Sequence, residues 1–479
     1  MPKIEITRTE LVWPGKYDEE GNLVPPRRVN LPFQVIEGVN ETRATRERHK
    51  EELAGHVGTL FDYWQAEEEQ MAGEGDGWRN KLIWGDNLYV MGSLLEHFAG
   101  KIDLICIDPP FATGADFSFT SQIGDGDVKV TKEQSIIEEK AYRDTWGQGL
   151  NSYLSMMYER LWLVRDLLSD SGSLYVHIDW HVGSQIRLML DDIFGQSCFR
   201  NEIVWFYRRW PTRAKNFQRM HDTILFYTKN TDNSHVFNTL WEEASERTLS
   251  DYGGKRLTTV QTKDGTWVKR ETDEESQGVS LRDVWDVKKV HPRGYEHLDF
   301  DTQKPEALLE RIITVSSNEG DLVTDFFCGS GTSLAVAEKL GRRWIGCDMS
   351  RYAIHTTRKR LMDIPDCRPF EILNLGQYER QVWQGVTFGG QKRPQQMLIF
   401  EYLKFILDLY GAQPLAGTQH LHGKKGSAVI HVGAVDAPVT IDEINECLAE
   451  CKAMEQKELH VLGWEWEMGI NRLMVDQAK

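Results

Sequence analysis

Short apolar runs alternate with amphipathic segments through the middle of the chain, which is the pattern of an α/β protein. Residues 102–107 are mostly apolar and are followed by Asp108-Pro109-Pro110-Phe111. Such a run is typical of a parallel strand that is covered on both faces. Since prolines cannot donate to a sheet ladder, the strand must end at Asp108. Ligands of α/β proteins bind at the carboxyl ends of parallel strands, so we expect Asp108 at a binding edge.

Further runs repeat this alternation along the chain. The expected strands are 81–84, 173–179, 202–207, 223–227 and 343–347, and the expected helices are 88–98, 151–170, 182–193 and 332–340. Strands that alternate with helices are typical of a mostly parallel sheet. A smaller group of the same kind lies near the C-terminus, with strands at 427–432 and 459–464 around a helix at 441–454.

A turn rich in small residues follows the strand that starts at Asp321 and precedes the helix from Thr332. Gly329 and Gly331 allow the backbone to approach a ligand closely at the helix N-terminus. The next strand ends in Asp348, and an acid in this place can bind both hydroxyls of a ribose. Because the turn is not G-x-G-x-x-G, a dinucleotide is disfavoured. A nucleoside with a neutral or cationic tail, such as S-adenosylmethionine, fits better.

Asp108, the proline carbonyls and Phe111 suit a flat ring that carries an exocyclic amine. The oxygens accept hydrogen bonds from the amine, and Phe111 stacks on the ring. The alternative is a strand that happens to end in a proline turn, and these four residues alone do not exclude it.

A basic segment at 207–221 lies between two expected strands. It holds five Lys or Arg residues and no acidic residue, interleaved with aromatic rings. The candidate contacts to nucleic acid are Arg208, Arg209, Trp210, Arg213, Lys215 and Arg219. Guanidinium groups bind phosphates, and rings stack on unstacked bases. A solvated loop is the alternative.

Composition narrows the class of protein. The 479 residues carry a net charge of −17, which disfavours indiscriminate nucleic-acid binding but permits a local basic cleft. No stretch is long and apolar enough for a membrane span, and the N-terminus has no signal-peptide pattern. The seven cysteines are scattered without a C-x-x-C pair, which indicates reduced thiols in a cytoplasm and argues against a zinc ribbon. We expect no metal.

The motifs at 108–111 and 325–332 together resemble those of the amino-methylating DNA methyltransferases. That family has a catalytic motif (D/N/S)-P-P-(Y/F) and a cofactor motif D-x-F-x-G-S-G-T. The catalytic motif comes first here, which is the permuted order of the β class. Residues 85–88, 172–179, 302–309 and 344–348 resemble other family segments. Residues 221–227 resemble a segment of the modification subunits of type III restriction systems.

The resemblance implies a Rossmann-like S-adenosylmethionine-dependent methyltransferase fold, with an inserted target-recognition region and a small C-terminal α/β module. The implied catalytic residues are Asp108, Pro109, Pro110 and Phe111. The implied cofactor-binding residues are Lys304, Asp325, Phe327, Cys328, Gly329, Ser330, Gly331, Thr332 and Asp348. The expected domains are residues 1–79 (accessory segment), 80–230 (catalytic half), 231–300 (target-recognition insert), 301–365 (cofactor-binding half) and 366–479 (linker and C-terminal module).

The resemblance also implies a site-specific activity: methyl transfer from S-adenosylmethionine to N6 of a flipped-out adenine in double-stranded DNA, within a restriction-modification or related system. An Asp at position 108 favours adenine, and N4 of cytosine is the alternative. Methylation of RNA or of a protein glutamine, or nucleic-acid binding without turnover, are further alternatives, and the intact motif speaks against loss of chemistry. A restriction subunit and a second copy of the chain are the protein partners left open. We expect a cytoplasmic protein.

Overall fold

The computed structural model describes, with short gaps, residues 9–40, 78–110, 149–375 and 402–463, together with two short strands between 119 and 132. The chain divides into two compact units. One comprises residues 1–30 and 35–373, and the other comprises residues 31–34 and 374–479. The finer domain boundaries expected from the sequence stay predictions.

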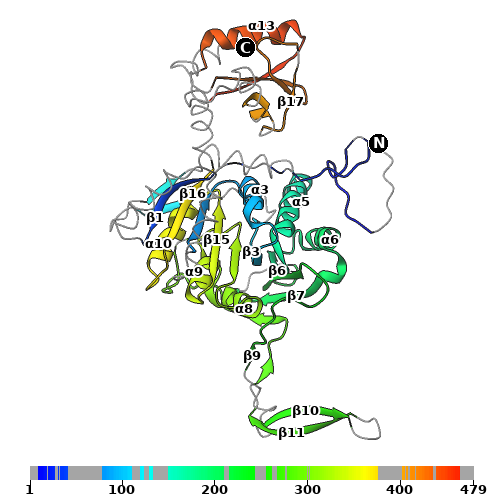
Figure 1. The fold of residues 1–479 in the computed structure, drawn as a ribbon, viewed down its shortest axis with the longest axis vertical. Coiled ribbons are helices and arrows are strands. Elements are labelled where there is room, and N and C mark those ends of the chain that lie inside the picture. The colour runs from blue at the N-terminus through cyan, green and yellow to red at the C-terminus, as the bar shows by residue number, and fades with distance from the viewer. Residues whose placement is uncertain are drawn as a thin grey trace. The chain divides into compact units, whose positions relative to one another are not determined.

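A ten-stranded sheet lies at the centre of the first unit (Figure 1). Its order is β1-β16-β2-β15-β14-β3-β6-β8-β7-β13. In chain order its strands are β1 Gln34–Val39, β2 Asn80–Trp84, β3 Ile102–Ile107, β6 Leu168–Ile178, β7 Phe199–Phe206, β8 His221–Thr228, β13 Val284–Asp286, β14 Leu322–Asp325, β15 Arg343–Asp348 and β16 Phe370–Asn374. The strands from β2 to β6 in this order run parallel, whereas β8 is antiparallel to both β6 and β7.

Helices connect the parallel strands in two directions across the sheet. The helices are α3 Asn87–Phe98, α5 Leu150–Leu167, α6 Gly183–Phe194, α8 Glu306–Ser316, α9 Thr332–Lys339 and α10 Arg351–Met362, with a 3-10 turn at Gln196–Cys198. The connections β2–α3–β3 and β3–α5–β6 step one way, and β14–α9–β15 steps the other way. Since such crossovers are right-handed, α3 and α5 cover one face and α9 covers the other. This confirms the predicted Rossmann-like α/β fold. The direction reverses between β3 and β14, which is the switch point where α/β sheets bind ligands.

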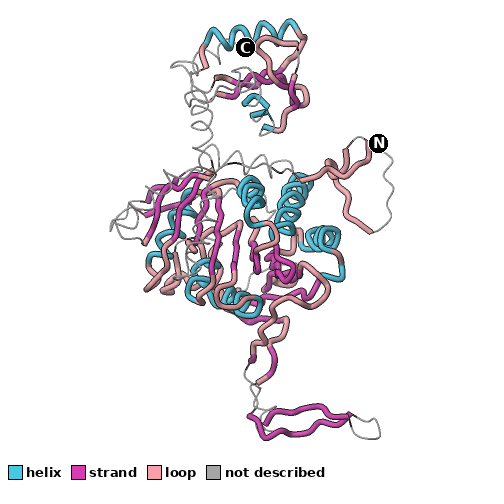
Figure 2. Tube along the Cα trace, viewed as in Figure 1, coloured by secondary structure: helices cyan, strands magenta, loops and turns pink. Residues whose placement is uncertain are grey.

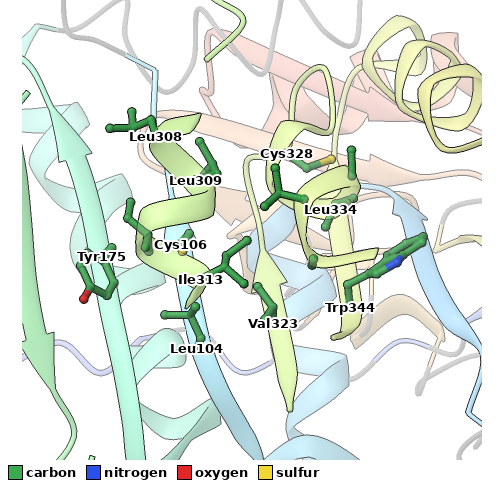
Figure 3. Packing of buried hydrophobic residues seen from close by; sticks show 14 of the residues in the cluster. Leu104, Cys106, Tyr175, Leu308, Leu309, Ile313, Val323, Cys328, Leu334 and Trp344 are labelled. Carbon is green, nitrogen blue, oxygen red and sulfur yellow. The ribbon is translucent and has the colours of Figure 1, made fainter. Parts of the chain in front are cut away.

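Buried apolar side chains fix α8 on the sheet. Leu308, Leu309 and Ile313 of α8 belong to one cluster with Leu104 and Cys106 of β3, and all of them are at most 8% exposed (Figure 3). Each fully buried Leu or Ile contributes roughly 1.5–3 kcal/mol. The packing therefore also fixes the residues just before α8, among them Lys304.

The segment between β8 and α8 contains several strands. β10 Lys255–Gln261 and β11 Trp267–Glu275 form an antiparallel ribbon (Figure 2). β9 Trp241–Glu242 pairs with β12 Val279–Ser280. β13 pairs with β7, so part of this segment belongs to the main sheet. A further pair, β4 Phe119–Gln122 and β5 Lys129–Lys132, lies earlier in the chain.

The second unit is a small α/β module, as the sequence predicted. Its sheet has the order β17-β18-β19-β20. These strands are β17 Gln413–Pro414, β18 Gly423–Lys425, β19 Ala428–Val432 and β20 Glu458–Leu462, and the helix is α13 Ile441–Ala453. β19 and β20 are parallel and are connected through α13, which begins with a capping box at Thr440 and Glu443. Across the described parts of both units, no helix is long and apolar enough to cross a membrane.

Candidate active site at the switch point of the sheet

Asp108 follows β3 directly and holds two basic side chains. Its Oδ1 is 2.5 Å from Nδ1 of His177 on β6, and its Oδ2 accepts a hydrogen bond from the ammonium of Lys304, just before α8. Burial by itself would raise the pKa of Asp108, but the charges of Lys304 and His177 outweigh it and lower that pKa to about 2. The carboxylate is therefore ionised and can only accept hydrogen bonds at neutral pH.

Lys304 joins the two predicted halves of the site. The sequence assigned it to the cofactor, whereas the structure places its ammonium on the Asp108 carboxylate. Its backbone carbonyl accepts a hydrogen bond from Thr332 Oγ1, at 3.1 Å, in the first turn of α9. Lys304 thus contacts the predicted catalytic residue through its side chain and the predicted cofactor turn through its backbone.

The turn after β14 is held by hydrogen bonds to two carboxylates. Asp325 accepts from the Phe327 N–H at 2.9 Å and from Ser333 Oγ at 2.5 Å. Burial raises the pKa of Asp325 to about 7 in spite of these neutral donors, and the negative charges of Asp108 and Asp348 act in the same direction. Asp325 therefore differs in protonation from Asp108, although β14 and β3 are neighbours.

Asp348 orders the same turn from the end of β15. Its Oδ2 accepts the Gly329 N–H at 2.9 Å, and its Oδ1 accepts the Ser350 N–H at 2.8 Å. Gly331 is required by the packing: its φ is +70°, and a Cβ there would lie 2.5 Å from Cγ2 of Thr357.

A cavity at the switch point brings the two predicted groups together. The predicted site residues that line it are Asp108, Pro109, Pro110, Lys304, Asp325, Phe327, Cys328, Gly329, Ser330, Thr332 and Asp348. Gly331 supports the turn without lining the cavity, and Phe111 lies outside the described residues. Apolar side chains such as Phe300 and Leu308 complete the wall. The cavity therefore combines carboxylates, backbone polar groups and apolar side chains in one place.

The predicted nucleic-acid contacts do not line this cavity where they are described. Arg208, Arg209, Lys215 and Arg219 are exposed, while Trp210 and Arg213 lie outside the described residues. Arg209 donates to the Tyr207 hydroxyl at 2.9 Å, and the Arg219 guanidinium lies 3.5 Å from the ring centre of Trp180. Trp180 follows β6 and is 54% exposed, so it adds an aromatic ring that the sequence reasoning missed.

Two further features of the cavity were not assigned from the sequence. One is His177, which lies among buried apolar residues of β6. The other is a network around Arg160, which donates to Asp86 at 2.9 Å and to Asn87 at 2.5 Å. Asn87 in turn donates to the Phe326 carbonyl at 2.9 Å, so this network connects the start of α3 to the turn after β14. The signal in the sequence was Gly85-Asp86-Asn87 between a strand and a helix.

Known proteins are similar to this chain over the region that contains most of the cavity. A family model described as DNA methylase matches residues 102–359. The type II methyltransferase M.EcaI of Enterobacter cloacae is 29% identical over 334 residues, covering 59% of this chain and 69% of that protein. The DNA adenine methyltransferase YhdJ of Escherichia coli strain K12 is 30% identical over 288 residues, covering 58% and 82%.

Longer and more distant similarities also occur. The Mod subunit of the type III restriction-modification enzyme StyLTI of Salmonella typhimurium is 25% identical over 451 residues, covering 74% of this chain and 67% of that protein. Among solved structures, the M1.HpyAVI–SAM complex matches with 19% identity and a TM-score of 0.37, covering 59% of this chain and 100% of that one.

Proposed function

The chain belongs to the DNA methylase family, and from that premise we propose that it methylates the exocyclic N6 amine of an adenine in duplex DNA, with S-adenosylmethionine as the methyl donor. The observation that carries the proposal is the single cavity shared by Asp108 and the turn from Asp325 to Thr332. A nucleophile bound at the first and a methyl donor bound at the second would meet at the switch point.

The cavity suits S-adenosylmethionine in its chemistry. Asp348 lines the cavity at the end of β15 and offers a carboxylate acceptor to ribose hydroxyls. Gly329, where a Cβ would come within 3.3 Å of Phe300, presents its backbone to the cavity without a side chain. The apolar side chains of the wall can hold the adenine ring. The surrounding carboxylates favour a sulfonium cation over a phosphate. When bound there, S-adenosylmethionine supplies an electrophilic methyl group.

The residues after β3 would prepare the amine. An exocyclic amine is a poor nucleophile because its lone pair is delocalised into the ring. Acceptors at Asp108 and at the Pro109 carbonyl would bind its hydrogens and favour a pyramidal nitrogen. Because a rigid parallel strand holds these acceptors, positioning and electrostatics would supply most of the rate. The base must leave the duplex to reach them.

Adenine is the preferred target on two grounds. The first motif residue is Asp, and the relatives include a protein named as a DNA adenine methyltransferase. N4-cytosine is the second candidate, because its exocyclic amine offers the same two hydrogens to the acceptors at Asp108 and Pro109. The cavity chemistry itself accepts either exocyclic amine.

We also propose how the chain works with its partners. The similarity to a Mod subunit supports assembly with a restriction subunit in the cytoplasm. The exposed residues Arg208, Arg209, Lys215 and Arg219, which lie between β7 and β8, would bind DNA phosphates.

The test is chemical. DNA from a methylation-free host that expresses the chain is digested to nucleosides and separated by chromatography. We expect N6-methyladenine, and long-read sequencing would give its sequence context. N4-methylcytosine without N6-methyladenine would change the target and keep the reaction class. Unmodified DNA from a folded protein that binds S-adenosylmethionine would overturn the proposal.

A further inference from the structure

Beside Asp108 lies a row of buried polar side chains that crosses three strands. His177 comes from β6 and is 7% exposed, and Asp222 comes from β8 and is 8% exposed. Nδ1 of His177 is 2.5 Å from Oδ1 of Asp108, and its Nε2 is 3.7 Å from Oδ2 of Asp222. The imidazole therefore lies between two carboxylates, one at the candidate active site and one deeper in the sheet.

At the other end of this row, Asp222 has further hydrogen-bond partners. Asp222 shares a hydrogen bond with the Tyr207 hydroxyl, which in turn accepts from Arg209 at 2.9 Å. The ring of His177 packs at a tilt on Trp205, with centroids 5.6 Å apart. Regular pairing of β6 with β3 and β8 fixes the backbone on either side. His177 consequently has little freedom to turn away from Asp108.

This arrangement divides the two oxygens of Asp108 between different tasks. An ionised carboxylate only accepts hydrogen bonds, so the hydrogen between it and His177 comes from Nδ1. Oδ1 is thus committed to a buried neighbour. Oδ2 contacts the ammonium of Lys304, a longer side chain that a donor from a ligand can replace.

We propose that His177 is a positioning residue for methyl transfer: it holds Oδ1 of Asp108 and thereby presents Oδ2 to the amine of the target base. This inference rests on the proposed function. His177 touches neither the base nor the methyl donor in this role. It keeps the accepting oxygen in the geometry needed for attack, where a displacement of about 1 Å can cost about 10²-fold in rate.

Three variants separate this role from simple core packing. In His177→Asn the amide nitrogen lies near the position of Nδ1 and can still donate to Asp108. In His177→Gln the amide nitrogen lies near Nε2 and reaches toward Asp222 instead. His177→Ala removes both contacts. His97→Ala is the matched control, because His97 is equally buried (8% exposed) at the end of α3 and does not line the cavity.

The experiment measures single-turnover methylation of a duplex together with the affinities for S-adenosylmethionine and for DNA. We expect His177→Ala and His177→Gln to lose about 10²-fold in rate, and His177→Asn to stay within about tenfold of the wild type. Both affinities should remain within about threefold in every variant, and His97→Ala should keep its rate.

Equal losses in the Asn and Gln variants would overturn the proposal, because the contact with Asp108 would then not matter more than the contact with Asp222. Unchanged rates in all three variants would do the same. Both results require an active wild type, so they differ from failure of the proposed function, in which the wild type itself leaves the duplex unmethylated and the positioning role falls with it.

Discussion

Two aspartates follow or end neighbouring parallel strands of the same sheet and yet differ sharply in protonation. Asp108 lies beyond β3, and Asp325 ends β14, the strand beside it. Burial raises the pKa of each carboxyl. At Asp108, Lys304 and His177 outweigh this effect and bring the pKa to about 2, whereas the hydrogen-bond donors to Asp325 are neutral and its pKa rises to about 7.

The difference shows that the neighbouring side chains of a carboxyl, more than its burial, set its protonation on each side of the switch point. The side of β3 carries a fixed negative charge that can accept hydrogen bonds from an amine. The side of β14 carries a carboxyl whose hydrogen bonds to Ser333 and Phe327 order a backbone turn. Asp108 thus suits a catalytic role, and Asp325 suits a structural role in the turn. Variants of Asp108 should therefore change the rate of methyl transfer, and variants of Asp325 should change stability.

Asp108→Ala should have the largest effect. We expect methyl transfer to fall by about 10²–10⁴-fold, the usual range for loss of a positioned catalytic group. S-adenosylmethionine affinity should be nearly intact, because the turn after β14 is held mainly by Asp325 and Asp348. Single-turnover rates and calorimetry measure the two effects. Equal loss of cofactor affinity would show that the two sides are not separate.

The resemblance of residues 325–332 to a family motif gave Asp325. The sequence pattern predicted Asp108 because it stands at the end of an apolar run, where the local pattern alone defines a strand end. The turn at 329–332 and the fold class were predictable for the same reason. The contacts of Asp108 were not, since His177 and Lys304 are 69 and 196 residues away along the chain. Which side chains meet there depends on strand order, and local periodicity does not contain strand order.

Asp325→Asn should change the pH dependence of stability. The folded-state pKa of Asp325 lies above the ordinary value. The contribution of this carboxyl to the free energy of unfolding is therefore fully present below about pH 4 and is lost as the pH rises toward 7. The amide does not titrate. Relative to the wild type, the variant should therefore gain stability between pH 5 and pH 8, by about 3 kcal/mol at most.

Thermal melts at the two pH values measure this gain. Asp363→Asn, at an exposed carboxyl on the C-cap of α10, is the control and should show no such gain. A difference between Asp325→Asn and wild type that does not vary with pH would mean that Asp325 is ionised in the folded protein, like Asp108.

Asp348→Ala should weaken S-adenosylmethionine binding by about 1–3 kcal/mol, the cost of leaving polar groups without a charged acceptor. The variant also removes the acceptor for the Gly329 N–H, so Asp348→Asn, which keeps one acceptor oxygen, should lose less. Calorimetry with the cofactor measures both. Unchanged affinity in Asp348→Ala would exclude the ribose-binding role.

Lys304→Met should make Asp108 more like Asp325. The variant removes the ammonium charge, which lowers the pKa of Asp108 more than the charge of His177 does, so that pKa should rise from about 2. Methyl transfer needs the ionised carboxylate, so the acid limb of the rate profile should move to higher pH. Lys304→Arg keeps the charge and should retain the wild-type profile. Single-turnover rates from pH 5 to pH 9 measure the shift.

The contradicting outcome is one pH profile shared by Lys304→Met and the wild type, together with a loss of cofactor affinity in the variant. Lys304 would then serve the methyl donor, as its place in the sequence motif first indicated, and its charge would not be needed to keep Asp108 ionised.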